Sequence, residues 1–382
     1  MQFIEKNLLK VSLENRVKAD IADNRLLGAA IHVCQNGVTL YHDSIGMADP
    51  EESLPVTEQT VFRLASMTKP ITAAAVMILV ERGLLTLDDP VDKFLPAYSS
   101  MRISGISEAG ECMDLGPACE KPTVRRILSH TSGIGCGKLG AFQIRNMTAS
   151  DKETLENTVS YFSRQGLSFE PGSKQEYSGF PAYDVLAAII EIAADEPYEC
   201  FLKRELLDPC DMQDTTYSPD IAQWGRMAAM HNRVDGKSIV TPMPINTVFE
   251  GIPCEHPLAG AGLVSTLNDY SHFASMLLNE GQYCGRQILS ADSVREIRSP
   301  QVSAAVQPGL QRWGLGVRVI TDSLYPYLPV GSYGWSGAYG PHFWIDPTNR
   351  ITAIYMRNSF FDPGAGSVAG YHFEQDVYSS MR

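Results

Sequence analysis

Ser66 and Lys69 stand three positions apart in the segment Ser66-Met67-Thr68-Lys69. Residues i and i+3 lie on one face of a helix, so the Lys69 amine can take the proton that Ser66 must lose to become a nucleophile. Such a pair also arises by chance, and a capping serine followed by a solvated lysine is then the usual structure. The rest of the chain must decide whether the pair carries chemistry.

The sequence after Ser66 predicts a buried helix. Its apolar residues recur at helical spacing, and Gly83 is well placed to end it. Pro70 fits the first turn, where a missing backbone N–H costs nothing. A helix that begins at Ser66 directs its free N–H groups and the positive end of its dipole toward whatever Ser66 attacks. The apolar positions are Ile71, Ala74, Ala75, Ile78 and Leu79.

Strands are predicted at both ends of the chain. The segments 28–33 and 38–42 flank Gln35-Asn36-Gly37, and Asn-Gly between two apolar runs is a strong hairpin signal. They follow an amphipathic helix predicted within residues 1–20. The further predicted elements are strands 313–320, 331–335, 342–345 and 351–356, and helices 181–194, 267–279 and 371–380.

This order of elements predicts an α+β protein in which both termini contribute to one antiparallel sheet, flanked by helices. We expect residues 1–84 and 285–382 to form this discontinuous sheet domain, and residues 85–284 to form a mostly helical inserted domain. The active site is then expected in the cleft between the two.

The composition is that of a globular protein, with 44% hydrophobic and 20% charged residues among 382. A formal net charge of −13 argues against binding to nucleic acid or to an anionic membrane, since both need concentrated Lys and Arg. We therefore expect a small-molecule substrate that is neutral or only modestly charged. Residues 1–20 contain no apolar run of signal-peptide or membrane-spanning length, which favours a cytoplasmic protein.

The eight cysteines and eight histidines are dispersed, without Cys-x-x-Cys or paired Cys/His spacing. Reduced thiols are the default for such a protein. This pattern gives no support for zinc, and we expect neither a metal nor another cofactor.

Five motifs follow one another in a recognisable order, which makes a chance match improbable. In that order the sequence resembles, over about residues 25–360, the serine β-lactamase-like and penicillin-binding-protein-like family. It is most similar to the class C β-lactamase-like (family VIII) carboxylesterases and transacylases of that family. The motifs are Ser66-Met67-Thr68-Lys69, Leu128-Ser129-His130-Thr131-Ser132-Gly133, Phe169-Glu170-Pro171-Gly172 leading to Tyr177-Ser178, Gly262-Leu263-Val264-Ser265-Thr266, and Gly334-Trp335-Ser336-Gly337 followed by Asp346-Pro347.

The resemblance implies a β-lactamase/transpeptidase-like fold and a serine that is acylated by the substrate. It makes Ser66 the nucleophile, Lys69 its proton acceptor and Tyr177 a second acid/base group. It also implies an oxyanion hole formed by the backbone N–H groups of Ser66 and Ala338. The substrate-binding strand, which is Lys-Thr-Gly in many members, is Trp335-Ser336-Gly337 here.

The chemistry of these side chains agrees with the implied roles. Lysine and tyrosine both titrate near 10 when unperturbed, which is too high for an efficient base at neutral pH. Burial lowers the pKa of a lysine, and a nearby cation lowers that of a tyrosine. Lys69 and Tyr177 can thus share one proton as a coupled pair, and either of them can deprotonate Ser66.

Two departures from the family pattern bear on the substrate. The family's Tyr-x-Asn is Tyr177-Ser178-Gly179 here, so a side-chain amide is missing. The lysine of Lys-Thr-Gly is replaced by Trp335, which removes a positive charge for a substrate carboxylate. Both changes favour uncharged esters, because a carboxylate in an apolar cleft without a partner is costly to desolvate.

We therefore predict a serine carboxylesterase that acts on small to medium, mostly apolar esters through an acyl-Ser66 intermediate. A transacylase with an alcohol acceptor is the first alternative. A weak β-lactamase or D-amino-acid peptidase and a catalytically inactive binding protein are the others. His130 with Asp184 or Asp269 would offer a Ser-His-Asp reading, but a structural histidine is the favoured interpretation for His130, as for His342 near the cleft.

Overall fold

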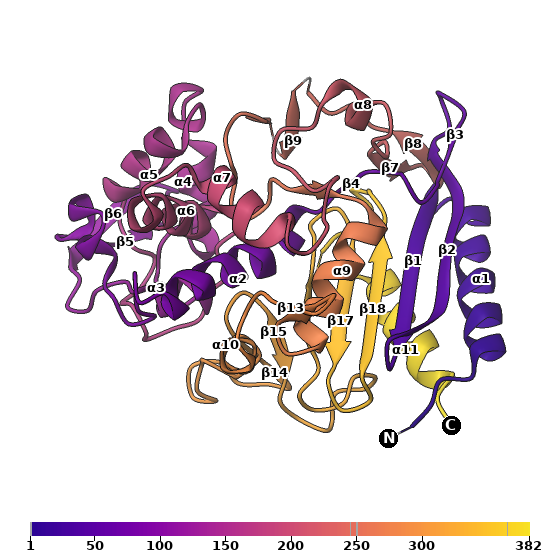
Figure 1. Ribbon diagram of the computed structural model, residues 1–382. Coiled ribbons are helices and arrows are strands. Elements are labelled where there is room, and N and C mark those ends of the chain that lie inside the picture. Colours follow the sequence, from indigo (N-terminus) through magenta and orange to yellow (C-terminus); the bar gives the residue numbers. More distant parts are fainter. Residues whose placement is uncertain (1, 245, 250, 365) are drawn as a thin grey trace.

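A large antiparallel sheet built from both ends of the chain forms one part of the molecule, and a group of helices forms the other (Figure 1). The computed structural model describes residues 2–244, 246–249, 251–364 and 366–382. Within these residues the sheet has eight strands, which confirms that the two termini share one sheet. In spatial order they are β14 (Gln311–Trp313), β15 (Arg318–Ile320), β16 (Tyr333–Ser336), β17 (His342–Asp346), β18 (Ile351–Met356), β1 (Gly28–Gln35), β2 (Val38–Asp49) and β3 (Leu54–Pro55).

Side chains alternate between the two faces of the sheet, so each face has its own core. On β17, Ile345 belongs to the larger core and Trp344 to the smaller one. Helix α9 (Leu267–Leu278) covers the first face, while α1 (Lys6–Ala22) and α11 (Val368–Ser379) cover the second (Figure 1). The sheet is thus the middle of three layers.

Helix α1 forms where the sequence predicts an amphipathic helix, although Met1 lies outside the described residues. Leu9, Leu13 and Val17 recur at every fourth position and are the residues that the helix buries. The Glu5 carboxylate caps the helix by accepting hydrogen bonds from the first backbone N–H groups.

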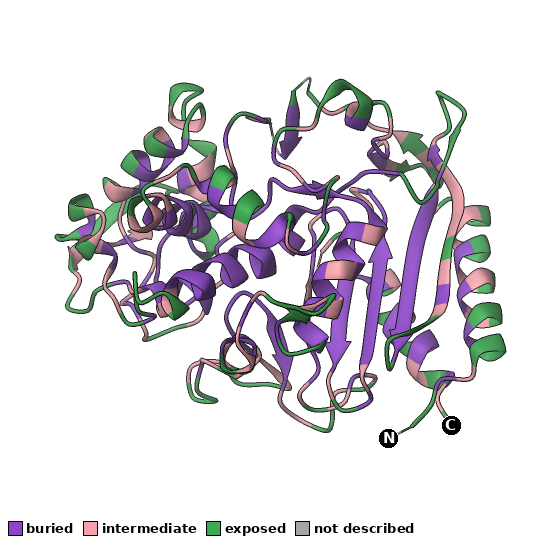
Figure 2. Cartoon of the chain, in the orientation of Figure 1, coloured by how far each residue is buried: buried purple, intermediate pink, exposed green. Residues whose placement is uncertain are grey.

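Helix α2 (Thr68–Glu81) runs through the middle of the molecule and is buried from Thr68 to Leu79 (Figure 2). Its burial confirms the interpretation of the apolar spacing after Ser66. Gly83 follows its end with φ 68°, the left-handed conformation in which glycine commonly ends a helix. Helix α6 (Pro181–Ala194), also predicted, packs against α2.

The other described helices are shorter than α1, α2, α6, α9 and α11. The proposed division into residues 1–84 with 285–382 and residues 85–284 stays a prediction, and α9, which precedes residue 284, packs on the sheet. The helices are α3 (Val124–Leu128), α4 (Gly137–Arg145), α5 (Leu155–Ser163), α7 (Tyr198–Leu202), α8 (Ile221–Trp224) and α10 (Ala291–Ile297). The paired short strands are β4 (Phe62–Arg63) with β11 (Val264–Ser265), β5 (Arg102–Ile106) with β6 (Cys112–Pro117), β7 (His231–Val234) with β8 (Lys237–Val240), β9 (Thr247–Phe249) with β10 (Ile252–Pro253), and β12 (Gln282–Tyr283) with β13 (Arg286–Gln287).

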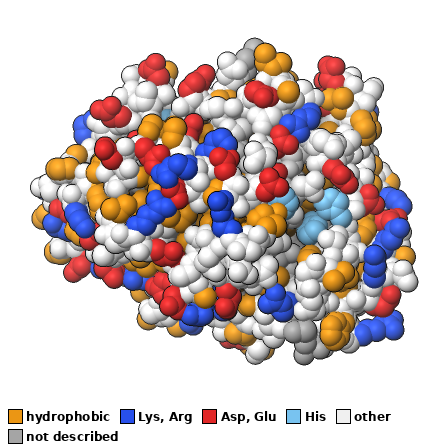
Figure 3. Space-filling model, viewed as in Figure 1, with side chains coloured by type: hydrophobic (Ala, Val, Ile, Leu, Met, Phe, Trp, Pro, Cys, Tyr) orange, Lys and Arg blue, Asp and Glu red, His pale blue; other side chains and the backbone are white. Residues whose placement is uncertain are grey.

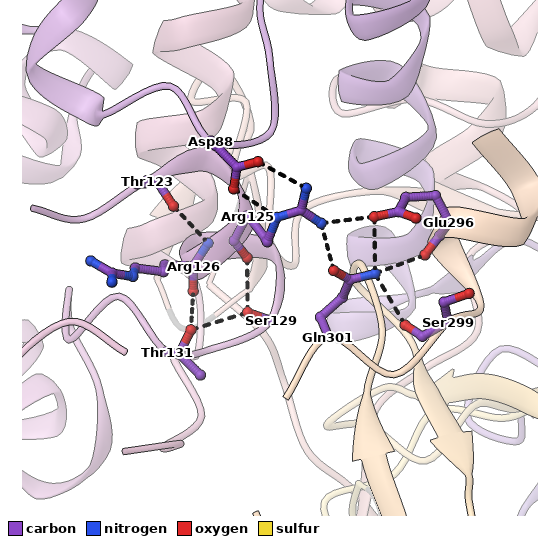
Figure 4. A network of polar contacts seen from close by, with 9 residues as sticks. All are labelled: Asp88, Thr123, Arg125, Arg126, Ser129, Thr131, Glu296, Ser299 and Gln301. Atoms are coloured by element: carbon purple, nitrogen blue, oxygen red, sulfur yellow. Dashed lines mark hydrogen bonds and ion pairs between the residues drawn. The ribbon is translucent and has the colours of Figure 1, made fainter. Parts of the chain in front are cut away.

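Arg125 connects the helices to the edge of the sheet (Figure 4). Its guanidinium on α3 donates hydrogen bonds to Asp88, to Glu296 on α10 at 2.7 Å and to Gln301 at 2.6 Å. The backbone N–H of Gln301 in turn donates to the carbonyl of Trp313 at 2.7 Å. This network therefore holds β14 in place relative to α3.

The single strand predicted over residues 313–320 is wrong. The segment forms two short strands, β14 and β15, joined by a turn in which the Gly314 N–H donates to the Val317 carbonyl. Gly316 has φ 72°, which a glycine adopts without strain, and its N–H donates to the Leu128 carbonyl. The sequence does not reveal this turn, because the residues before and after it are apolar and buried, as they would be in one continuous strand.

No helix in the described part of the chain is long and apolar enough to cross a membrane. On the face shown in Figure 3, acidic and basic side chains are interspersed instead of gathered by sign. Surface ion pairs such as Lys93 with Asp89 and Arg102 with Asp114 reflect this mixing.

Gly316→Ala should destabilise the protein more than Gly83→Ala. Both glycines have positive φ, so either change costs about 1–2 kcal/mol of backbone strain. A Cβ at Gly316 would also lie 2.8 Å from Ala73 Cβ and 3.0 Å from the Lys69 carbonyl oxygen, whereas a Cβ at Gly83 would meet nothing within 4 Å. Crowding of this kind adds about 1–3 kcal/mol. Urea denaturation measures both losses, and equal losses would contradict the close packing of this turn.

Candidate active site

Ser66 lies in a 3₁₀ turn, Ala65–Met67, directly before helix α2. The helix expected to begin at Ser66 thus begins at Thr68, and Ser66 occupies the preceding turn. Ala65 has φ 45°, a conformation that non-glycine residues rarely adopt and that clusters at functional sites. Ser66 is 7% exposed and lines a cavity, so its hydroxyl is held at the cavity wall.

The Lys69 side chain is completely buried beneath Ser66. Its Nζ lies 3.4 Å from Ser66 Oγ. It donates hydrogen bonds to two backbone carbonyls, those of Gly179 and, at 2.8 Å, of Gly260. The rings of Tyr177 and Tyr183 lie 4.9 Å and 5.0 Å from the amine, measured to the ring centroids. The amine is therefore enclosed by backbone oxygens and aromatic faces, away from water.

Tyr177 approaches Ser66 from the segment before α6. Its hydroxyl donates a hydrogen bond of 2.7 Å to Ser66 Oγ. It also accepts one of 3.2 Å from Trp335 Nε1, at the end of β16. Ser66 Oγ thus has a phenol on one side and an amine on the other.

An aromatic cluster holds Tyr177 in this position. The His130 ring lies 4.5 Å from the Tyr177 ring and 4.2 Å from the Trp313 ring, between centroids. Trp313 in turn contacts Trp335 at 4.5 Å. These rings have few rotatable bonds and pack against one another, so Tyr177 has little freedom to turn away from Ser66.

Burial shifts the two titratable groups beside Ser66 in opposite directions. It lowers the pKa of Lys69 to about 7, against a smaller upward effect of Asp184, because the interior favours the uncharged amine. It raises the pKa of Tyr177 to about 12, although the hydrogen bonds with Ser66 and Trp335 counteract it. Of the two, Lys69 is the group that changes protonation near neutral pH.

The cavity at Ser66 has a volume of about 400 Å³. Aromatic rings and neutral amides form much of its wall, and no acidic side chain is found among its described lining residues. Two cations are among these residues: Arg318, which is paired with Glu374 at 2.8 Å, and Arg312. The lining residues are Ser66, Gln175, Tyr177, Gln307, Gln311, Arg312, Trp313, Arg318, Trp335, Ser336, Ala338 and Gly364.

Ser66 and Ala338, whose backbone N–H groups are the expected oxyanion hole, both line this cavity. Within the described residues, neither N–H donates to a backbone or side-chain acceptor of the protein. Gly337, expected to contact substrate, has a different local reason to be glycine. A Cβ there would lie 2.1 Å from the Leu64 carbonyl oxygen, so its absence lets the end of β16 approach the turn that carries Ser66.

His130 takes part in the site only as a packed ring. Its Nδ1 accepts a hydrogen bond of 3.2 Å from the Ser178 N–H, and burial lowers its pKa well below the usual value. Asp184 instead accepts from the Ala259 N–H, and Asp269 from Thr215 Oγ1. Neither carboxylate contacts His130, so the geometry does not form a Ser-His-Asp triad.

Several groups in the site were not anticipated from the sequence. The carbonyls of Gly179 and Gly260 carry no signal, because every residue has a carbonyl. Trp313 was expected only as part of a strand. Glu374 could have been noticed, since it lies one position from Phe373 and three from Val377, two apolar residues that α11 buries.

Lys69→Met should change how stability depends on pH. The pKa of Lys69 is about 7 in the folded protein, and a lysine in the unfolded chain titrates near 10.4. Between these values the unfolded chain binds more protons, so this lysine makes stability rise as pH increases from about 7 toward 10.

Urea denaturation at pH 7 and pH 9 tests this dependence. The wild type should gain roughly 2 kcal/mol relative to Lys69→Met over this interval. Lys10→Met is the matched control, because Lys10 is 60% exposed, and it should follow the wild type. Parallel pH profiles for the wild type and Lys69→Met would contradict the lowered pKa.

The chain is similar to known proteins along most of its length. Residues 13–375 match the family model for beta-lactamases. The chain is 29% identical over 363 residues to protein Rv1367c of Mycobacterium tuberculosis, with 88% of this chain and 87% of that protein covered. It is 28% identical over 375 residues to esterase EstB of Burkholderia gladioli, with 91% and 89% covered.

A solved structure of EstCE1, described as a hydrolase with promiscuous acyltransferase activity, is similar with a TM-score of 0.81. At 23% identity over 98% of this chain and 99% of that one, this likeness bears on the fold alone. It confirms the predicted β-lactamase/transpeptidase-like α+β fold. Because the family model matches nearly the whole of this chain, the chain belongs to the beta-lactamase family.

Proposed function

We propose that this protein is a serine hydrolase, and specifically a carboxylesterase that works through an acyl-Ser66 intermediate. The observation that carries the proposal is the position of Ser66 Oγ, 2.7 Å from a phenol and 3.4 Å from a buried amine whose pKa is about 7. A serine hydroxyl is a weak nucleophile until a neighbouring base removes its proton. An efficient base has a pKa near the pH at which the enzyme works, and the pKa of Lys69 is near neutral pH.

The hydrogen bonds of Lys69 direct its lone pair toward Ser66. A neutral amine has two N–H donors and one lone pair, and the carbonyls of Gly179 and Gly260 accept from both donors. The lone pair is left for the Ser66 hydroxyl hydrogen. Tyr177 has the higher pKa and keeps its proton, which it donates to Ser66 Oγ. This arrangement supports Lys69 as the base and Tyr177 as the acid.

The reaction then proceeds with balanced proton transfer. The Ser66 proton moves to Lys69 as Ser66 Oγ bonds to the acyl carbon. The N–H groups of Ser66 and Ala338 are free to stabilise the oxyanion that forms, an interaction worth about 3 kcal/mol per donor in other enzymes. The departing alkoxide takes one proton back from the Lys69–Tyr177 pair. Water repeats the sequence on the acyl-enzyme and releases the acid.

The cavity supports small to medium, mostly apolar esters as substrates. Its volume of about 400 Å³ is in the range of small-molecule sites. Trp335 stands where many relatives have a lysine and offers its indole N–H to Tyr177 instead of a charge to the substrate. The relative named esterase EstB also supports this proposal.

Transfer of the acyl group to an alcohol is the second candidate function. The cavity favours it, because a mostly apolar cavity can admit an alcohol in place of water, and the solved neighbour EstCE1 is described as having promiscuous acyltransferase activity. β-Lactamase or D-amino-acid peptidase activity has less support, because residue 179 is a glycine and residue 335 a tryptophan. A catalytically inactive binding protein would not need the Ser66, Lys69 and Tyr177 arrangement.

Ser66→Ala should abolish hydrolysis of p-nitrophenyl butyrate, with a loss of at least about 10³-fold in kcat/KM, because no acyl-enzyme can form. Intact-mass spectrometry after brief mixing should show a butyryl adduct on the wild type and none on Ser66→Ala. Ser271→Ala on α9 is the matched control, since the hydroxyl of this buried serine donates to the Asn268 carbonyl of its own helix. Wild-type hydrolysis by Ser66→Ala would refute the proposal.

Added 1-butanol should divert the acyl group from butyrate to butyl butyrate if the cavity admits an alcohol. Gas chromatography of both products measures the partition. The ester should increase with the alcohol concentration, and both products should be absent with Ser66→Ala. Free acid as the only product at every alcohol concentration would exclude the transacylase.

A further inference from the structure

A chain of buried hydrogen bonds leads from the cavity wall to helix α11. Ser336 Oγ lies 2.7 Å from His342 Nδ1 on the neighbouring strand. His342 Nε2 lies 3.1 Å from Glu374 Oε1, and Arg318 Nη2 donates to the same oxygen at 2.8 Å. Ser336, His342 and Glu374 are 5%, 3% and 1% exposed. Of these four residues only Ser336 and Arg318 line the cavity.

The protonation of this chain follows from its charged end. Burial raises the pKa of Glu374, but the charge of Arg318 and the contact with His342 outweigh it and lower that pKa to about 2. Glu374 is therefore a carboxylate and only accepts hydrogen bonds. His342 Nε2 must carry the hydrogen that it receives. Burial also lowers the pKa of His342, although Glu374 opposes this, so the ring is neutral and Nδ1 has no hydrogen.

This tautomer determines which way the Ser336 hydroxyl points. A serine hydroxyl has one hydrogen and two lone pairs, and it normally rotates to suit its surroundings. Here its hydrogen is donated to His342 Nδ1. What Ser336 can still offer to the cavity is a lone pair. The amides of Gln175, Gln307 and Gln311 in the same wall carry donors and acceptors and can serve either way.

We propose that Ser336 forms an acceptor subsite that selects esters bearing a hydroxyl or amide N–H near the scissile bond, and that His342 and Glu374 are its positioning residues. The inference rests on the proposed function and narrows its substrate class. An ether oxygen or carboxylate at this point would face another acceptor and gain no hydrogen bond. A substrate O–H or N–H would gain one in a site of low dielectric.

Two p-nitrophenyl esters test the subsite, 3-hydroxybutyrate and its 3-methoxy analogue, which lacks the donor. The readout is the ratio of their kcat/KM values, because a general loss of activity cancels in it. Ser336→Ala should lower this ratio about tenfold from the wild-type value, as expected for one lost hydrogen bond. Ser336→Thr keeps a hydroxyl and should keep the ratio, and Ser271→Ala is again the matched control.

His342→Phe tests the positioning role separately. It retains Ser336 and leaves the Arg318–Glu374 ion pair in place, but it frees the Ser336 hydroxyl to rotate. The ratio should therefore fall toward that of Ser336→Ala. An unchanged ratio in both Ser336→Ala and His342→Phe would overturn the inference. Hydrolysis of both esters by Ser66→Ala would instead overturn the proposed function, so the two failures are distinguishable.

A spectrum of the ¹⁵N-histidine-labelled wild type tests the tautomer without any substrate. The His342 signals are those missing from the spectrum of His342→Phe. At pH 7 they should show a protonated Nε2 and an unprotonated Nδ1. A protonated Nδ1, in either the other neutral tautomer or the imidazolium, would overturn the inference even if the variants folded poorly.

Discussion

The enclosure of the Lys69 amine is the constraint on which the rest of the structure depends. A lysine inside a protein is tolerated when it is neutral and its N–H groups are bonded, and the carbonyls of Gly179 and Gly260 provide those bonds. To supply them, the segment before α6 and the loop before β11 must both close over the start of α2. Helix α2 must in turn be buried along almost its whole length. The fold therefore maintains the chemistry of one side chain through backbone positions that lie far apart in the sequence.

Near this amine, one side chain is uncharged and one cation is paired. Trp335 carries no charge and donates a hydrogen bond to Tyr177 from its indole N–H. Arg318 is neutralised by Glu374 behind the wall. The oriented dipoles of the site can stabilise a charge that appears during the reaction. Geometry and family membership together make acyl transfer the chemistry best supported.

Much of the fold was predictable because local patterns specify local structure. Asn36-Gly37 indicates its hairpin, the spacing of Leu9, Leu13 and Val17 indicates α1, and Gly83 indicates the end of α2. The grouping of Ser66, Lys69 and Tyr177 followed from motif order. What escaped prediction depends on partners distant in sequence. The turn between β14 and β15 is buried and apolar, so it looks like part of a strand. The Lys69 site is completed by two glycine carbonyls, which carry no sequence signal. The contact of His342 with Glu374 could be predicted only by knowing which face of α11 packs on which strand.

The turn between β14 and β15 has a consequence for how this protein can evolve. Gly316 packs on the backbone of Lys69, and Trp313, at the start of the same turn, forms part of the aromatic wall of the cavity. The wall that selects the substrate and the support beneath the base are thus parts of one short element, not separate modules. A lineage that reshapes the pocket by altering this turn also disturbs the base. New specificities should therefore arise more readily from lining residues outside this turn, such as Gly364.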